Sequence, residues 1–185
     1  MKSPEDILTF WFEDAGPSVW YKKSDEFDAR IRSEFEDTAI ELAGDLSRRA
    51  PHKWENEAAS ALALIIALDQ FPRNMYRGTS AAFAWDELAL GAAKRLVEKN
   101  HDLKISQSQR AFVYMPYMHS EKLTDQDDCI ALVDQRLESE NTLHHAREHR
   151  KVIAKFGRFP HRNDSLKRRS TAAESEFLSA GGYAP

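Results

Sequence analysis

The chain has 185 residues, of which 42% are hydrophobic and 30% are charged, a composition typical of a soluble globular protein with its own core. Its net charge of −4 gives no reason to expect a nucleic-acid partner, and its single cysteine, Cys129, excludes an intramolecular disulfide and a cysteine-rich zinc site. The N-terminus lacks the pattern of a signal peptide and no apolar run reaches the roughly 20 residues that span a bilayer, so we expect a cytoplasmic protein of one domain (residues 1–185) with no membrane partner.

Two helices are predicted in residues 1–51. Ser3, followed by Pro4 and two acidic residues, has the pattern of a helix start, and Gly16 with the proline after it ends that helix. Ser24 is placed to begin a second helix, in which apolar residues keep a helical spacing until Pro51. Both helices therefore present one apolar face to a core.

The most apolar stretch of the chain is predicted to be its central helix. From residue 58 to 68 every residue except Ser60 is apolar, and a helix that is apolar on all sides must be covered on all sides. We expect this helix to run from about Asn56 to Phe71 and to end at Pro72, because the residue before a proline is pushed out of the helical region. The most buried helix thus ends in a polar turn.

Helical signals continue to the C-terminus. A helix is expected over residues 81–99, with Asp86 as a possible second start, and another begins at a Ser106–Gln109 capping box and is interrupted by Pro116. Further helices are expected from Thr124, over residues 142–156 and over residues 171–180. Because no alternating strand pattern appears, the sequence predicts an all-α fold of about eight helices that pack as antiparallel hairpins.

A short turn motif occurs twice. The segment 70–74, QFPRN, resembles 158–163, RFPHRN, and each follows an apolar helix and precedes further arginines. Two copies are compatible with stacked helical hairpins but do not establish a repeat protein. In the first copy we expect Asp69 and Gln70 to hold Arg73 or a neighbouring backbone group.

Basic residues are concentrated near the C-terminus. Residues 147–169 contain nine Lys or Arg and two acids, a net charge of +7, so the remaining residues must carry −11. An arginine-rich surface can bind a phosphate, a carboxylate or an acidic peptide, because the planar guanidinium bonds two oxygens at once. The alternative is that these charges complement the acidic remainder of the chain or form a solvated face. Nucleic-acid binding is not expected, because no known module accompanies the basic run.

Two histidine motifs are candidates for chemistry. His145 and His149 lie four residues apart, the spacing of a zinc pair on a helix, but no clear set of further ligands follows, so we predict no bound metal. The tripeptide His119-Ser120-Glu121 contains hydrolytic residue types, yet catalytic triads are assembled in space from distant positions. A helix cap with salt bridges is the alternative role of this tripeptide.

These motifs carry a resemblance to a known family. The chain resembles the bacterial family called domain of unknown function 924 in ILTFWFE (7–13), LDQFPRNMYRGT (68–79), FAWD (83–86), RAFVYMPYMHSE (110–121), HRKVIAKFGRFPHRN (149–163), RRST (168–171) and EFL (176–178). The resemblance implies an all-helical fold similar to a tetratricopeptide-like right-handed array, and it implies no activity. Most matching positions are polar or charged, which favours a site or a buried polar network: Arg73, Asn74, Arg77, Asp86, Arg110, His119, Ser120, Glu121, His149, Arg158, Pro160, His161, Arg162 and Asn163.

Three functional interpretations follow from the sequence. The first is a binding module without a cofactor, whose polar site receives an anionic small molecule or a peptide, and a protein partner stays open. Its expected ligand-binding residues are Arg73, Asn74, Arg77, Arg110, His119, Ser120, Glu121, Arg158, His161, Arg162 and Asn163. The second is a hydrolase that uses His119 or Glu121 as acid or base with arginines stabilising an oxyanion. The third is a purely structural network of the same residues.

A spatial expectation connects these interpretations. We expect Arg73, His119, Glu121, Arg158 and Arg162 to converge on one polar site, because each lies at or just after a helix end. Several arginines in one place repel one another unless an acid or a bound anion lies among them. An excess of positive charge at this site would therefore attract an anionic ligand.

Overall fold

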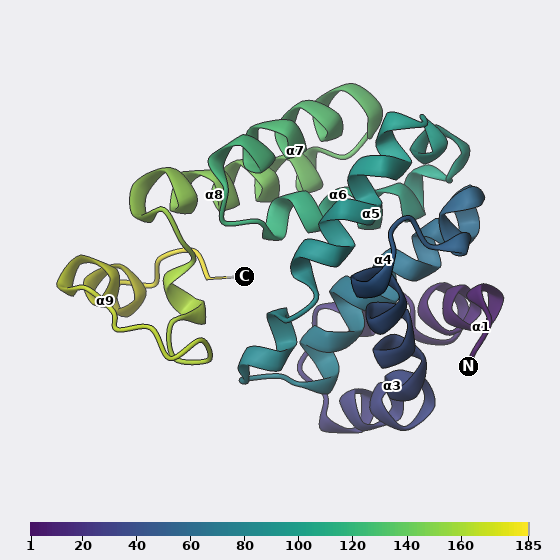
Figure 1. Cartoon of the computed structure of the whole chain (residues 1–185). Coiled ribbons are helices and arrows are strands. Elements are labelled where there is room, and N and C mark those ends of the chain that lie inside the picture. Colours follow the sequence, from purple (N-terminus) through teal and green to yellow (C-terminus); the bar gives the residue numbers. More distant parts are fainter. Residues whose placement is uncertain (185) are drawn as a thin grey trace.

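The computed structural model describes residues 1–184, and all regular secondary structure in these residues is helical (Figure 1). Within these residues lie nine α-helices: α1 (Pro4–Thr9), α2 (Pro17–Trp20), α3 (Asp25–Arg48), α4 (Ala58–Met75), α5 (Asp86–Glu98), α6 (Gln107–His119), α7 (Leu123–Arg136), α8 (Glu140–Phe156) and α9 (Ala172–Ser179). Shorter helical segments connect them: η1 (Phe10–Ala15), η2 (Lys53–Asn56), η3 (Ser80–Phe83), η4 (His101–Lys104) and η5 (Pro160–Arg162). The all-α prediction is confirmed, and none of the helices in residues 1–184 is long and apolar enough to cross a bilayer.

Helix α4 lies at the centre of the core, as its sequence predicts. It packs against α1, α3, α5 and α6, and the side chains of Leu62, Ile65, Ile66 and Leu68 are fully buried. Apolar residues from every side of α4 are covered because a different helix faces each side. Consecutive long helices from α3 to α8 pack against one another, which is the neighbour pattern of helical hairpins. The right-handed tetratricopeptide-like array stays a prediction.

Several helix ends follow their local sequence signals. The hydroxyl of Ser3 accepts a hydrogen bond from the Asp6 backbone N–H in a complete capping box, and the hydroxyl of Ser24 caps α3 by accepting from the Phe27 backbone N–H. Gly157 ends α8 with a φ of 69°, a left-handed conformation that costs little only for glycine. The predicted box at Ser106 is wrong, because this hydroxyl pairs with the hydroxyl of Ser108 and leaves the start of α6 without a side-chain cap.

Two prolines that were expected to end or interrupt helices lie inside them. Helix α4 continues past Pro72 and α6 continues past Pro116, and both prolines are buried. A proline inside a helix removes one hydrogen bond and displaces the preceding turn. Next to Pro72 the Asp69 carbonyl also accepts a hydrogen bond of 2.6 Å from Nη1 of Arg73. The burial of both prolines against other parts of the fold therefore outweighs the local preference.

The last turns of α8 and the chain that follows them form a second, smaller apolar cluster. Figure 1 shows η5 and α9 on one side of the molecule, far from α1. The buried members of this cluster are Val152, Ile153 and Phe159, and Phe156, Phe177 and Tyr183 pack against them. Because η5 follows Phe159 directly, this cluster fixes the position of the basic segment that faces the helical body.

Candidate functional site

The polar end of α4 meets the start of α5 in a largely buried ion-pair network. Nη1 and Nη2 of Arg73 donate to the two carboxylate oxygens of Asp86 at 2.9 and 3.0 Å, and Nη1 lies 3.2 Å from Oδ1 of Asp69. Asp69 is fully buried, as expected for a side chain on the most apolar helix. The expectation that Asp69 holds Arg73 is therefore confirmed, and one arginine bridges two carboxylates.

Asp69 also fixes the orientation of His119 at the end of α6. Nδ1 of His119 lies 2.8 Å from Oδ1 of Asp69, and Gln70 donates to the other carboxylate oxygen at 2.6 Å. Burial raises the pKa of Asp69, but Arg73 and His119 outweigh this effect and hold it below its usual value. A charged carboxylate accepts a hydrogen bond from Nδ1–H, so Nε2 of the neutral His119 ring keeps its lone pair. Burial and Arg73 lower the pKa of His119, which favours the neutral imidazole.

Arg162 approaches the same network from η5. Its guanidinium lies 4.6 Å from the ring centre of Phe83 and 4.6 Å from that of Phe159. Nη1 donates to Asp86 across 3.3 Å, while the buried Nε has no hydrogen-bond partner among residues 1–184. Burial, reinforced by the nearby charge of Arg73, lowers the pKa of Arg162 to about 10. This side chain is thus a buried cation with incomplete compensation.

Two further histidines, His149 and His161, have ring nitrogens without hydrogen-bond partners near Arg162 within the described residues. Nδ1 of His149 donates to the backbone carbonyl of His145 at 2.8 Å, so Nε2 carries a lone pair, and Nε2 is buried without a partner within the described residues. Nδ1 of His161 is buried and equally unpaired in the part of the chain that the structure describes. The ring centres of His119 and His149 lie 6.3 Å apart. Burial lowers the pKa of His149 to about 3 and that of His161 to about 4, so both are neutral near pH 7.

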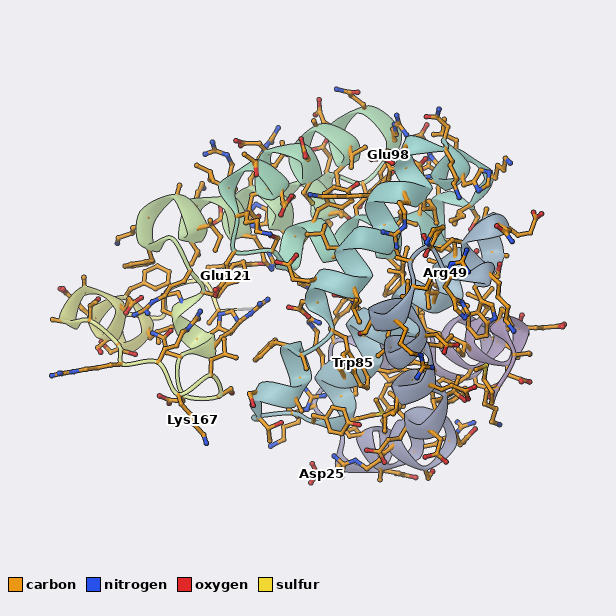
Figure 2. The ribbon with its side chains drawn as sticks, viewed as in Figure 1. Asp25, Arg49, Trp85, Glu98, Glu121 and Lys167 are labelled. Carbon is orange, nitrogen blue, oxygen red and sulfur yellow. The ribbon has the colours of Figure 1, made fainter. Side chains whose placement is uncertain are left out.

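Glu121 is placed next to this network but is occupied by its own partner. Its two carboxylate oxygens accept hydrogen bonds of 2.6 and 2.9 Å from Arg168, and one of them also accepts from the Phe159 backbone N–H. Burial raises the pKa of Glu121, but Arg168 and that N–H outweigh it and hold the pKa below its usual value. In Figure 2, Glu121 lies where the helical body faces the C-terminal segment that carries Lys167. Glu121 therefore anchors this segment.

The expected excess of positive charge is absent from the network. Arg73 and Arg162 face Asp69 and Asp86, and Glu121 faces Arg168. These carboxylates neutralise the positive charge of the guanidiniums, because acidic residues lie near the same helix ends as the arginines. Any attraction for an anion must therefore come from unsatisfied hydrogen-bond donors, not from net charge.

Two predicted site residues of the C-terminal segment are directed toward α9. Arg158 donates to both carboxylate oxygens of Glu174 at 2.6 and 2.8 Å, and Asn163 bonds Glu174 and Ser170. The expectation that Arg158 converges with the other arginines is not met, because Glu174 at the start of α9 provides a closer carboxylate. Both residues hold α9 against the loop that follows η5.

Four other predicted site residues have structural partners elsewhere. Arg77 makes a bidentate pair with Asp28 and also donates to Asn74, and the hydroxyl of Ser120 donates to Asp125 at 2.6 Å. Arg110 is buried and donates to four backbone carbonyls, which belong to residues 102, 103, 105 and 136. Four of the five N–H donors of this guanidinium are therefore engaged by backbone carbonyls, which holds the side chain in the fold. Arg77, Asn74, Arg110 and Ser120 therefore stabilise the fold.

The described residues provide no ready metal centre. Within residues 1–184 no group of three or more histidine, cysteine, aspartate or glutamate side chains is arranged to hold a metal ion. His145 and His149 share a helix face, but Nδ1 of His145 pairs with the hydroxyl of Tyr183 at 2.8 Å. The helical spacing of these two histidines therefore reflects packing against the C-terminal cluster.

Sequence reasoning underestimated two residues of the network. It treated Asp69 only as a partner of Arg73, although Asp69 also orients His119 from 50 residues away. It did not select Arg168, the partner of Glu121 at a separation of 47 residues. A charged residue directly after the apolar run, still on the most buried helix, is a usable signal for Asp69, whereas no local spacing indicates the pairing of Arg168.

Comparison with known proteins agrees with the fold and the motifs. A family model described as "Bacterial protein of unknown function (DUF924)" matches residues 7–182. A search of curated proteins finds no match. The solved structure of the protein of unknown function ATU0120 from Agrobacterium tumefaciens is 38% identical, with a TM-score of 0.87 over 96% of this chain and 97% of that chain. Since the family model covers nearly the whole sequence and the motifs that build the polar network lie inside it, the chain belongs to this family of bacterial proteins of unknown function.

Proposed function

We propose that the protein binds a small anionic molecule, or the acidic end of a peptide, at Arg162. The observation that carries this proposal is the buried guanidinium whose Nε has no partner within the described residues. A buried charge is costly unless it is paired and hydrogen-bonded, and the 3.3 Å contact with Asp86 leaves this cation poorly compensated. A carboxylate or phosphate oxygen on Nε would supply the missing acceptor.

The neighbouring histidines define a second feature of the ligand. The lone pairs on Nε2 of His119 and Nε2 of His149 accept hydrogen bonds from a donor, and neither ring is positively charged near pH 7. A hydroxyl group satisfies such an acceptor, whereas a second anionic oxygen does not. The site therefore suits a molecule that carries one acidic group and one hydroxyl group, such as a small hydroxy acid.

Calorimetry on matched variants tests the binding proposal. Lactate, propionate and inorganic phosphate serve as probes, and Arg162→Gln is compared with Arg147→Gln, an equal charge change at an exposed arginine. We expect Arg162→Gln to weaken binding at least about tenfold, which corresponds to about 1.4 kcal/mol, and Arg147→Gln to leave it unchanged. Equal binding by both variants, each verified as folded by circular dichroism, contradicts the proposal.

A second variant separates the role of the hydroxyl group. His149→Phe keeps a planar ring of similar size but removes the acceptor nitrogen, while Arg162 stays in place; glutamine is unsuitable here because its amide oxygen accepts the same hydrogen bond. We expect this variant to lose the preference for lactate over propionate and to retain the affinity for propionate. An unchanged preference shows that the histidine does not contact the hydroxyl group.

The Asp69–His119 pair favours acid–base catalysis as the second candidate function. A buried carboxylate that orients Nδ1–H leaves Nε2 free as a general base, and the low pKa of His119 keeps that base unprotonated. Ser120 is directed to Asp125, so water is the candidate nucleophile and Arg162 the candidate oxyanion donor. Nitrophenyl acetate and nitrophenyl phosphate are suitable probes. Turnover that disappears in His119→Gln supports catalysis, and turnover unchanged in this variant refutes it.

A further inference from the structure

A half-open groove lies on a part of the molecule remote from the polar network. Its volume is about 850 Å³, and it is formed by α1, η1 and α2 on one side and by the first turns of α4 and α6 on the other. Figure 1 places α1 and α9 at opposite ends of the molecule, so this groove is separate from the C-terminal segment that carries Arg162. None of the residues assigned to the polar network lines it.

The floor of the groove is apolar and rigid. Leu8, Phe12 and Trp20 line it and are each partly buried. The rings of Phe12 and Trp20 meet edge to face with their centres 5.7 Å apart, and Trp20 also packs on Phe112 at 4.8 Å. The indole N–H of Trp20 already donates to the Trp11 carbonyl at 2.8 Å. The floor thus offers preformed hydrocarbon and aromatic surface that a partner can cover without reordering it.

The rim of the groove is acidic. Glu5, Glu13 and Glu57 line it, all three are exposed, and none of them makes an ion pair within the described residues. Among the described residues that line this groove there is no lysine, arginine or histidine. Many other acidic side chains of the protein do have a cationic partner, as Asp28, Asp86 and Glu174 do. Three unpaired glutamates around an apolar floor leave a local negative field that only an external cation can complement.

We propose that this groove docks a cationic amphipathic segment of another protein. Apolar side chains of the segment would cover Leu8, Phe12 and Trp20, while lysine or arginine side chains beside them would meet the three glutamates. The negative rim repels anionic lipid surfaces and nucleic-acid phosphates.

A peptide pair tests the charge and apolar requirements together. The probe is a fluorescein-labelled helical peptide of about four turns with leucine and tryptophan at positions i, i+3, i+4 and i+7 and lysine elsewhere. The matched peptide has glutamate in place of every lysine. Fluorescence anisotropy with the full-length protein is expected to give binding at least about tenfold tighter for the lysine peptide, with a difference that shrinks as salt is added.

Two charge-matched triple variants locate the binding surface. Glu5→Gln, Glu13→Gln and Glu57→Gln together should weaken the lysine peptide about tenfold or more. The control combines Glu41→Gln, Glu98→Gln and Glu138→Gln, which are exposed and outside the groove, and it should bind as the wild type does. All six positions are at the surface, so both variants are expected to fold.

The opposite results overturn the proposal. Equal weakening of peptide binding by both triple variants shows that affinity depends only on the net charge of the protein. Equal affinity of the lysine and glutamate peptides shows that the glutamates of the rim do not select cations. Absence of saturable binding of the lysine peptide also overturns it. So does self-association of the wild type that is lost in the groove variant, because the groove would then be occupied by a second copy.

Discussion

Replacing His149 with glutamine should reduce the acid sensitivity of folding. His149 is only 4% exposed, its Nδ1 donates to the His145 carbonyl, and its Nε2 has no partner within residues 1–184. A proton on Nε2 would create a buried cation without an acceptor, close to Arg162. Burial, His119 and Arg162 accordingly lower the pKa of His149 to about 3.

The size of the effect follows from the two pKa values. The ordinary pKa of the imidazole is 6.5, and in the folded protein that of His149 is about 3. As the pH falls through 6.5, the imidazole binds a proton in the unfolded chain but stays neutral in the folded chain. The contribution of His149 to the free energy of unfolding is therefore complete above this pH and is progressively lost below it. At about 1.4 kcal/mol per pH unit, His149 alone accounts for a loss of about 2 kcal/mol between pH 7 and pH 5.

Urea unfolding followed by circular dichroism measures this loss. The free energy of unfolding of the wild type and of His149→Gln is compared at pH 7 and pH 5, so any constant cost of the substitution cancels. The variant should lose about 2 kcal/mol less than the wild type over this range. His144→Gln, at an exposed position of the same helix, should behave as the wild type does. An equal loss in the wild type and in His149→Gln would refute the reasoning.

Three further outcomes test the packing of the fold. Ile65→Ala removes a fully buried side chain of α4 and should lower the free energy of unfolding by roughly 2–5 kcal/mol in a denaturant titration; a loss below about 1 kcal/mol would place this residue outside the core. Arg158→Ala breaks the pair with Glu174 and should speed amide exchange in α9 while anion binding stays unchanged; weaker anion binding would restore Arg158 to the site. Burial raises the pKa of the Cys129 thiol to about 12, so a thiol reagent should modify it only on unfolding, and rapid modification of the folded protein would contradict its burial.

Local sequence signals predicted the helical elements because those signals act over a few residues. The apolar run from Leu62 to Leu68 implies a covered helix, and the serine at position 24 and the glycine at position 157 set helix ends through their own backbone and side-chain chemistry. Pro72 and Pro116 show the limit of such signals. Each disfavours a helix locally, yet contacts from other helices hold both prolines inside helices.

The sequence by itself determined that the chain is all-helical, that α4 is buried, and that polar motifs at helix ends contain Arg73, His119 and Arg162. Only the tertiary structure decided which of the arginines are satisfied. Arg158 and Arg162 lie four residues apart, but the first meets Glu174 of α9 and the second meets Asp86 of α5. The physical reason is that helix formation depends on neighbours along the chain, whereas the partner of a buried charge depends on which distant helix ends packing brings within hydrogen-bond distance.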